Sequence, residues 1–488
     1  MSSRCERQLG YIIPTPKKIE KSEERILLSD TICVAHEAFL PAASTLCASV
    51  KKIFGKDITL SDRGIMLIKD DRMQAASYSV DTRGDCVILR ANDFEGICYA
   101  LSTFIMMITE RDGELCLARS FISDAPDRDY RALMVDLARE WHPLNTILKY
   151  IDVCFMLKIK YLHLHFIDDQ RYTLPSCVLP ELTKYSEHYT LDDIEKMRAY
   201  ANERSVIIVP EFEVPGHAAM LVRTYPEIFA LRAKSEDGAT IVSDGGAIIT
   251  AKNIICAGSS VTHDAVSKLI DEVCKMFPES PYIHIGGDEA NINAWNDCHE
   301  CVDYMREHGI SDVHELYSEF VGRVAQMVID NGRTPIVWEG FPEKGVDYIP
   351  KETIVIAWES LYQLAPSLLK HGFRVINGSW KPLYIVPSYQ NRWGAREILD
   401  WNVYTWQHWW DRSPAKLNPI HVPPTDQVLG AQISAWECTY EEEIGKVLES
   451  LPTLSELTWN TERLYTTDEF LNKLRHNVHR IARLIADV

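Results

Sequence analysis

The 488-residue sequence contains no apolar stretch long enough to span a bilayer, and its first residues lack the apolar core of a secretory signal. We therefore expect no membrane partner and a cytoplasmic location. Basic charge is also scarce, because 70 acidic residues against 51 basic ones give a formal charge of −19. This charge repels phosphate backbones and anionic bilayers, which argues against nucleic acid as a partner and leaves a neutral ligand fully compatible.

The sequence shows no regular disulfide or metal-binding spacing. Its 13 cysteines are odd in number and scattered, many within apolar runs, which indicates reduced buried thiols. Cys298 and Cys301 form one CxxC pair around His299, but no further ligands follow at regular spacing. We interpret this pair as a solvated helix turn, and we expect neither a metal nor another cofactor.

Internal repeats, low-complexity segments and glycine-rich phosphate loops are absent as well. An apolar fraction of 46% and a charged fraction of 25% are typical of a folded globular protein. Short strand-like segments and a helical stretch over residues 95–109 indicate a small α+β domain over residues 1–125.

Eight apolar, β-branched runs alternate with helical patterns after this region. The series predicts an α/β fold, a (β/α)8 TIM barrel over residues 126–445, with C-terminal helices of residues 446–488 packing on it. An open doubly wound sheet is the alternative, and the missing phosphate loop disfavours its nucleotide-binding version. The runs are 131–138, 161–166, 206–213, 282–289, 334–340, 353–359, 374–379 and 428–437.

Carboxylates and aromatic rings follow these runs, and the carboxyl ends of parallel barrel strands meet at one rim. Sugar rings offer apolar C–H faces to aromatic planes and hydroxyls to carboxylates, so a carbohydrate is the favoured ligand. Asp288 and Glu289 stand out because two glycines precede them, which allows a close backbone or ligand approach. We interpret His163, His165 and His284, which lie within the apolar runs, as hydrogen-bonded core residues.

Four stretches carry a family resemblance: RALMVDLAR, LHLHFIDDQ, PEFEVPGHA and YIHIGGDEA. They resemble signature stretches of the β-N-acetylhexosaminidases of glycoside hydrolase family 20, in the family's order. IIPTPKKIE and GICYALSTF are similar to the small non-catalytic domain that precedes the barrel in that family. The resemblance covers nearly the whole chain.

The resemblance implies a catalytic set around the acidic pair. Glu289 would be the general acid/base, and Asp288 would orient the substrate's 2-acetamido group and stabilise its charge. His217, with Asp168 or Asp169, would form a polar relay that tunes the acid. We expect this relay and a partly desolvated site to raise the pKa of Glu289, because an acid catalyst must be protonated near neutral pH.

The resemblance also implies a substrate-binding set. Arg131 would hold sugar hydroxyls, Tyr384 would donate to the acetamido oxygen, and Glu437 would contact a hydroxyl on the far side of the ring. Tryptophans would form the walls of the pocket, namely Trp338, Trp358 and Trp436. Lys381 and Arg392 nearby would favour a modified sugar, so the choice among GlcNAc, GalNAc and a 6-modified form stays open.

These residues predict a retaining exo-β-N-acetylhexosaminidase whose substrate carries a terminal N-acetylhexosamine. Adjacent carboxyl groups cannot easily straddle the anomeric carbon, whereas the substrate's own acetamido oxygen can attack it. Two alternatives remain. A catalytically silent sugar-binding protein would keep the aromatic rim without needing both acids. A metal-dependent barrel hydrolase would need a pattern of further metal ligands, and none stands out beyond His163 and His165.

Overall fold

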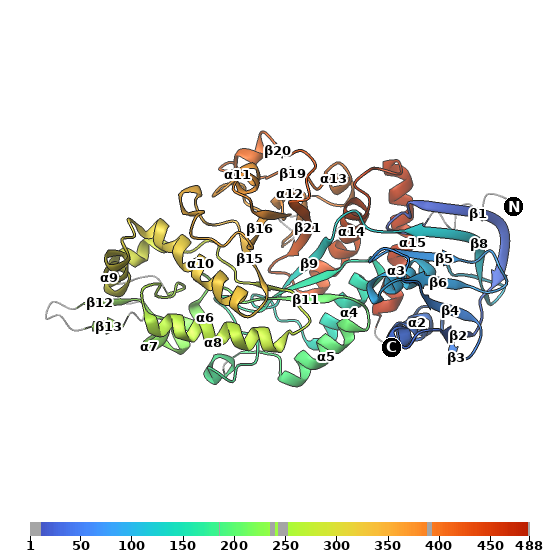
Figure 1. Ribbon diagram of the computed structural model, residues 1–488, viewed down its shortest axis with the longest axis horizontal. Coiled ribbons are helices and arrows are strands. Elements are labelled where there is room, and N and C mark those ends of the chain that lie inside the picture. Colours follow the sequence, from blue (N-terminus) through green and yellow to red (C-terminus); the bar gives the residue numbers. More distant parts are fainter. Residues whose placement is uncertain (1–10, 185, 235–239, 243–251, 388–392, 487–488) are drawn as a thin grey trace.

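The computed structural model describes residues 11–184, 186–234, 240–242, 252–387 and 393–486 of the chain. Two large sheets that share no strand organise it, and they lie side by side along the long axis of the molecule (Figure 1). No helix among the described residues is both long enough and apolar enough to cross a membrane.

The first sheet is built from the first quarter of the chain and has the strand order β1-β8-β5-β6-β4-β2-β3, with β7 paired to β8. Its strands are β1 (Lys18–Leu27), β2 (Thr31–Val34), β3 (Thr59–Leu60), β4 (Ile65–Lys69), β5 (Tyr78–Asp81), β6 (Ile88–Ala91), β7 (Thr109–Arg111) and β8 (Glu114–Asp124). Two helices pack on it, α2 (Leu40–Phe54) and α3 (Phe94–Met107). Helix α3 is buried along nearly its whole length because its sequence is apolar on every side.

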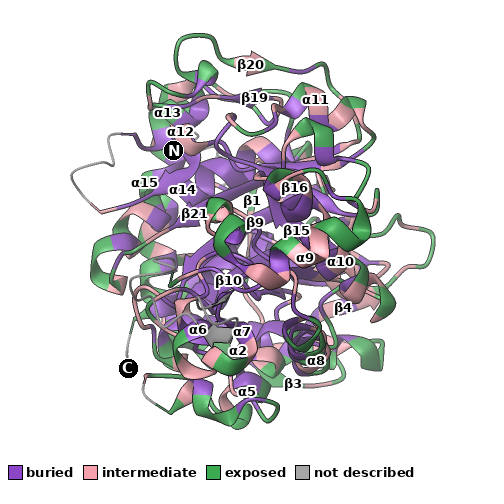
Figure 2. Cartoon of the chain, turned by 90° about the vertical axis from the view of Figure 1, so that its left-hand side faces the viewer, coloured by how far each residue is buried: buried purple, intermediate pink, exposed green. Residues whose placement is uncertain are grey.

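The second sheet is a closed parallel barrel, because β21 pairs with both β9 and β17. The eight runs predicted from the sequence supply its eight strands, which confirms the expected barrel. They are β9 (Tyr130–Asp136), β10 (Tyr161–His165), β11 (Ile207–Glu211), β14 (Tyr282–His284), β15 (Thr334–Trp338), β16 (Ile354–Ala357), β17 (Arg374–Asn377) and β21 (Val428–Ala435). Nearly every strand residue is buried, as in a sheet covered on both faces (Figure 2).

Helices surround the barrel, and exposed residues gather on their outer faces (Figure 2). The helices are α4 (Leu144–Met156), α5 (Leu191–Asn202), α6 (Ala219–Thr224), α7 (Pro226–Phe229), α8 (Ser260–Met276), α9 (His299–His308), α10 (Val313–Asp330), α11 (Ala365–Lys370), α12 (Trp380–Leu383), α13 (Ala395–Leu399), α14 (Tyr440–Trp459) and α15 (Thr467–Ile485). Short strands occur in the loops: β12 (Arg232–Lys234), β13 (Thr240–Val242), β18 (Tyr384–Ile385), β19 (Thr405–Trp406) and β20 (Ile420–His421).

Helix α15 is an amphipathic helix near the C-terminus. The Thr466 side chain accepts from the Glu469 backbone N–H and the Glu469 side chain accepts from Thr466, a reciprocal cap that starts the helix. Its buried face includes Phe470 and Ile481. Helix α15 packs against α4 of the barrel and α2 of the first sheet, so it bridges the two parts of the molecule (Figure 1).

The role expected for Arg131 needs correction, because this residue stands at the start of β9, the end of the barrel remote from the site. Its side chain is fully buried and donates to the carbonyl oxygens of Lys158 (2.9 Å) and Asp129 (3.2 Å) and to the Tyr99 hydroxyl of α3. The guanidinium also lies 5.2 Å from the Trp459 ring of α14. Arg131 therefore joins the barrel to the first sheet and contacts no part of the cavity.

Arg131→Met should lower the free energy of unfolding by about 2–4 kcal/mol, since it leaves buried carbonyl oxygens without donors. Urea denaturation of the variant and wild type measures this change. The kinetic constants of the folded variant should match those of the wild type. A stable variant with weakened sugar binding would contradict this placement and restore the role implied by the resemblance.

Candidate active site

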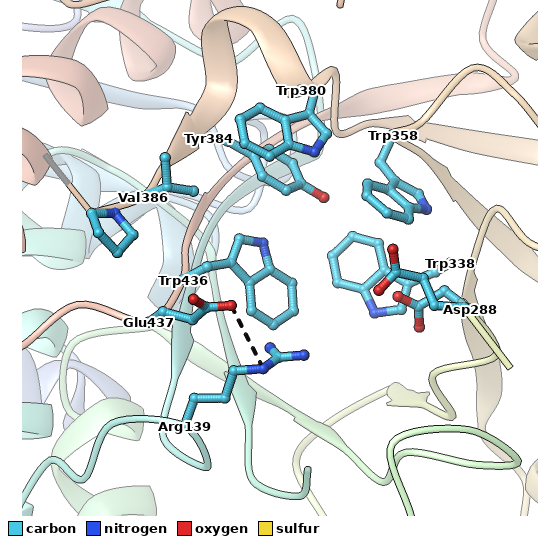
Figure 3. A pocket seen from close by; sticks show the side chains of 11 residues that line it. Arg139, Asp288, Trp338, Trp358, Trp380, Tyr384, Val386, Trp436 and Glu437 are labelled. Carbon is cyan, nitrogen blue, oxygen red and sulfur yellow. Dashed lines mark ion pairs between the residues drawn. The ribbon is translucent and has the colours of Figure 1, made fainter. Parts of the chain in front are cut away.

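The carboxyl ends of the barrel strands surround a cavity of about 210 Å³. Asp288 stands on one side and Glu437 with Arg139 on another, with aromatic rings between them (Figure 3). The cavity therefore combines acidic groups with apolar walls. Its lining residues are Arg139, Asp288, Glu289, Trp338, Trp358, Trp380, Tyr384, Val386, Pro387, Trp436 and Glu437.

The aromatic walls are held rigidly by hydrogen bonds and ring contacts. Trp338 Nε1 donates to Glu211 Oε1 (2.6 Å), and Trp358 Nε1 donates to the carbonyl oxygen of Glu339 (3.0 Å). The Tyr384 ring stacks on Trp380 with centroids 4.6 Å apart, and lies nearly parallel to Trp358 at 6.1 Å. Fixed rings offer a preformed apolar surface, which reduces the entropy lost when a ligand binds.

The acidic pair follows β14 through a strained turn. Gly286 and Gly287 have φ of 68° and 93°, and a Cβ atom on Gly286 would lie 1.9 Å from Glu213 Oε2. Glu289 itself has φ of 46°, a left-handed conformation that costs a non-glycine residue about 1–3 kcal/mol. The two glycines thus let the chain turn beside a buried carboxyl group and present Asp288 and Glu289 to the cavity.

Asp288 is the less accessible member of the pair. Its Oδ1 atom is buried and finds no hydrogen-bond partner among the residues that the structure describes, although the side chain lines the cavity. Burial raises the pKa of Asp288 to about 7. Glu213 lies next to it, and burial together with the Asp288 charge raises the pKa of Glu213 well above its usual value. Asp288 therefore carries an unpaired oxygen on a side chain that lines the cavity.

Glu289 is linked to a chain of charged groups. Its Oε2 lies 3.6 Å from His217 Nε2, and His217 Nδ1 lies 3.4 Å from Asp168 Oδ1. Asp168 Oδ2 lies 2.9 Å from His165 Nε2 and 2.7 Å from Arg139 Nη2. The aspartate left open by the sequence is thus Asp168, which the structure places against His217.

Asp169 takes a different position beside this chain. It accepts from the backbone N–H of Ala219 (3.0 Å) and from Asn253 Nδ2 (3.3 Å). These contacts hold the segment that follows His217 against the loop at Asn253. Asp169 therefore supports the loop that carries the histidine.

The expected rise in the pKa of Glu289 is wrong, because the hydrogen bond with His217 lowers this pKa. Although burial opposes a charged ring, Asp168 and Glu289 raise the pKa of His217 well above its usual value. Hydrogen bonds from His165 and His217 likewise lower the pKa of Asp168 despite its burial. Glu289, whose side chain is 54% exposed, therefore faces an imidazolium cation.

Glu211 forms the floor beneath the cavity. His163 Nε2 donates to its Oε2 at 3.1 Å, and His165 Nδ1 contacts the same oxygen. His284 Nδ1 lies 2.8 Å from Glu211 Oε1. The three imidazoles are thus arranged around a carboxylate, in agreement with the interpretation that they are hydrogen-bonded core residues. His163 Nδ1 also lies 3.2 Å from Gln432 Oε1, which ties the floor to β21.

Four of the lining residues were absent from the predicted set: Arg139, Trp380, Val386 and Pro387. Arg139 follows β9 at the site end of the barrel, contacts Glu437 (3.9 Å) and lies 5.1 Å from the Trp436 ring (Figure 3). Trp380 sits in the predicted stretch before Tyr384. The sequence could have identified Arg139 from its position after the strand, because barrel active sites lie at the carboxyl ends of the strands. Arg131, by contrast, begins the strand. Of the two cationic residues expected nearby, Arg392 lies outside the described residues, and Lys381 does not line the cavity.

A parallel barrel with an aromatic cavity and a carboxyl pair at its mouth is the arrangement of a carbohydrate-active enzyme. The family model for glycosyl hydrolase family 20, catalytic domain, matches residues 129–462. The chain belongs to this family, and it is therefore a glycoside hydrolase.

Known members of the family match most of the chain. A β-hexosaminidase of Porphyromonas gingivalis is 28% identical over 71% of the chain, although the match spans only 47% of that relative's length. A β-hexosaminidase of Vibrio furnissii is 25% identical over 87% of this chain and 72% of its own.

Solved structures show the same fold. An exo β-N-acetylglucosaminidase from Vibrio harveyi, determined with N-acetylglucosamine, superposes with a TM-score of 0.83 at 18% identity, covering 97% of this chain and 77% of that one. A β-N-acetylhexosaminidase from Bacteroides fragilis gives a TM-score of 0.78 at 23% identity, with coverage of 96% and 94%.

Asp168→Asn should lower the pKa of His217 by about 1–3 units, because it removes the anion that favours the charged ring. NMR titration of the imidazole in the variant and wild type measures this shift. The wild-type ring should stay protonated through neutral pH, consistent with its raised pKa. A neutral His217 at pH 7 in the wild type would contradict the proposed arrangement, in which a cationic His217 lies between the anions of Asp168 and Glu289.

Proposed function

We propose that the protein is a retaining exo-β-N-acetylhexosaminidase that removes terminal β-linked GlcNAc or GalNAc by substrate-assisted catalysis. One observation carries this proposal. Asp288 and Glu289 are neighbours that line the same cavity, and Asp288 Oδ1 is buried without a hydrogen-bond partner among the described residues. Such an acceptor matches an acetamido N–H, which a plain hexose lacks.

The positions of the other carboxyl groups support attack by the substrate itself. A protein nucleophile would have to stand about 5–5.5 Å from the acid and reach the opposite face of the anomeric carbon. Glu211 is occupied by its histidine and tryptophan partners. Glu339 accepts backbone N–H groups of the loop that begins at Ser360, including Ser360 (2.9 Å) and Leu361 (2.8 Å). These carboxylates serve the structure of the site.

In the proposed reaction, the acetamido oxygen attacks C1 while the bond from C1 to the leaving oxygen breaks and Glu289 donates a proton to that oxygen. The product is an oxazolinium ion whose positive charge lies beside ionised Asp288. Glu289, now a carboxylate, takes a proton from the incoming water as the water oxygen attacks C1. The bond from C1 to the acetamido oxygen breaks at the same time, which restores the acetamido group. Two inversions at C1 leave the β configuration unchanged.

Binding of the sugar prepares the acid. A sugar in the cavity excludes water from Glu289, and desolvation raises the pKa of a carboxyl group. The acetamido N–H meanwhile offers Asp288 a hydrogen bond to its charged form. These effects raise the pKa of Glu289 and lower the pKa of Asp288. Glu289 is then protonated and Asp288 ionised, as the reaction requires.

The remaining lining residues suit recognition of one terminal sugar. Trp338, Trp358 and Trp436 provide apolar faces, and the Tyr384 hydroxyl is a donor for the acetamido oxygen. Arg139 and Glu437 stand together at another side of the cavity, where they can bind sugar hydroxyls. Arg139 thereby takes the role that the resemblance gave to Arg131.

No observation favours the two alternatives over this proposal. A silent sugar-binding protein leaves the strained backbone of Glu289 unexplained. His163, Glu211 and His284 form a group that could hold a metal ion, but none of these three residues lines the cavity. A cytoplasmic location stays a prediction from the sequence.

Glu289→Gln should lower kcat by about 10²–10⁴-fold on substrates with poor leaving groups, because their departing oxygen needs a proton. Activated aryl glycosides, which need little protonation, should lose much less. Steady-state kinetics with GlcNAc and GalNAc versions of both substrate types measures the contrast. Glu437→Gln is the matched control, since loss of a hydroxyl contact should affect both leaving groups alike. Equal losses in Glu289→Gln would remove Glu289 from the acid role.

Fluorination of the acetamido methyl group should reduce kcat progressively from mono- to di- to trifluoroacetamido glycosides, because fluorine withdraws electrons from the attacking oxygen. Measured rates on the three aryl glycosides test this order. Asp288→Asn should remove the charge that stabilises the oxazolinium ion, so its rates should be low throughout the series. A flat series in the wild type, or a glycosyl group found on Glu211 or Glu437 by mass spectrometry, would contradict substrate assistance.

A further inference from the structure

Three cysteine side chains meet outside the cavity. The interpretation of Cys298 and Cys301 as a solvated turn is wrong, because both side chains are fully buried, as is Cys256. Cys256 Sγ lies 3.6 Å from Cys298 Sγ and 3.7 Å from Cys301 Sγ. The third thiol that the CxxC spacing lacked thus comes from a residue 42 positions earlier than Cys298.

The sulfur positions have the spacing of metal ligands. Zinc binds thiolate sulfur at about 2.3 Å, so two sulfurs on a tetrahedral ion stand about 3.8 Å apart. The two measured separations agree with this value. A disulfide requires about 2.05 Å and joins only two sulfurs, whereas here Cys256 approaches both partners equally. The arrangement therefore suits one cation shared by three thiolates.

Backbone N–H groups are directed at the sulfur cluster. The N–H of Arg232 donates to Cys298 Sγ at 3.4 Å, and the N–H groups of Cys301 and Gly258 also hydrogen-bond to the cluster. Gly258 permits close approach to α9, because a Cβ atom there would lie 2.3 Å from the Glu300 carbonyl oxygen. N–H groups directed at sulfur orient thiolate ligands and offset their charge.

A carboxylate and a balancing positive charge lie beside Cys256. Glu300 Oε2 is 3.6 Å from Cys256 Sγ, close to the separation of oxygen and sulfur on one zinc ion. The Arg232 guanidinium pairs with Glu300 and donates to Ser259 Oγ at 2.9 Å. It therefore adds a buried positive charge next to the anionic groups. His299, by contrast, contacts the Arg232 carbonyl oxygen through Nδ1 (2.7 Å).

We propose that Cys256, Cys298 and Cys301 bind one structural Zn²⁺ ion, with an oxygen of Glu300 or of water in the fourth position. Three protein thiolates and an oxygen satisfy the tetrahedral preference of zinc. An iron–sulfur cluster would need four protein ligands, and hard cations such as Mg²⁺ prefer oxygen sets. The cavity residues do not belong to this site.

The ion would fasten together the two loops that carry the catalytic groups. Ile255, next to Cys256, donates its N–H to the Pro215 carbonyl oxygen (3.1 Å) in the loop of His217. Trp295 Nε1 donates to the Ile255 carbonyl oxygen (2.9 Å) from the segment that joins Glu289 to Cys298. Zinc would add a covalent-strength link between these two segments, so its loss should loosen the contact of His217 with Glu289.

The test measures metal directly, on the 488-residue chain purified without a metal-binding tag. Plasma mass spectrometry should find about one zinc per chain, and growth in cobalt should give the thiolate-to-cobalt charge-transfer bands of a tetrahedral site. Cys256→Ala and Cys301→Ala should lose the metal, whereas Cys274→Ala, a matched change at a buried thiol elsewhere, should keep it. Glu300→Gln should change the cobalt spectrum if the carboxylate is the fourth ligand.

The wild-type measurements stand even if a cysteine variant fails to fold. Metal-free protein that takes up neither zinc nor cobalt under reducing conditions would overturn the proposal. So would a disulfide between any two of the three cysteines, detected by alkylation of the native protein and mass spectrometry. Equal metal loss in Cys274→Ala would show that the metal is held elsewhere. None of these readouts depends on the hydrolytic activity.

Discussion

The buried carboxylate of Glu211 is the contact on which the geometry of the site depends. It ends β11 and accepts hydrogen bonds from His163 and His165 of β10 and from Trp338 of β15. Although burial opposes ionisation, the neighbouring imidazoles lower its pKa well below the usual value. One anion thus fixes the floor and one wall of the cavity, and a neutral replacement would leave several buried donors unpaired.

The same anion acts on the acidic pair through charge. Glu211 and Asp168 raise the pKa of His165 to about 10 despite its burial, so this imidazole carries a positive charge at neutral pH. Asp168 then lies between His165 and His217 and keeps both of them cationic. Cationic and anionic side chains thus alternate from His165 to Glu289. Because Glu289 faces the cation of His217, its carboxyl group is ionised. Burial raises the pKa of Asp288 to about 7, so Asp288 takes up a proton more readily than Glu289.

The barrel could be predicted from the sequence, because its strands are buried on both faces and therefore appear as continuous apolar runs. The acidic pair was recognisable from the glycines before it, which the backbone at Gly286 requires. Arg131 was misplaced because a resemblance over nine residues does not say which arginine lies at which end of the strand. Position relative to the strand distinguishes it from Arg139, which follows the strand and lines the cavity.

Other features depended on long-range contacts that no local pattern contains. The charge of His217 follows from Asp168, which is brought to it by a different strand, so its effect on Glu289 had the opposite sign to the one expected. The burial of Cys298 and Cys301 likewise depends on Cys256 and its loop. A search for regularly spaced metal ligands in the sequence misses a site in which one cysteine, here Cys256, comes from a different loop of the barrel than the others.

Backbone strain connects these separate contacts. His217, Glu289 and Glu437 have φ of 47°, 46° and 59°, so three residues on three different loops adopt the left-handed conformation. Each costs about 1–3 kcal/mol and persists only where surrounding contacts hold the loop in place. For His217 those contacts are Asp168 and the segment before Cys256, and for Glu289 they are the glycine turn and the buried Trp295 segment. Anchoring the loops behind the cavity is therefore what allows strained residues to converge at its mouth.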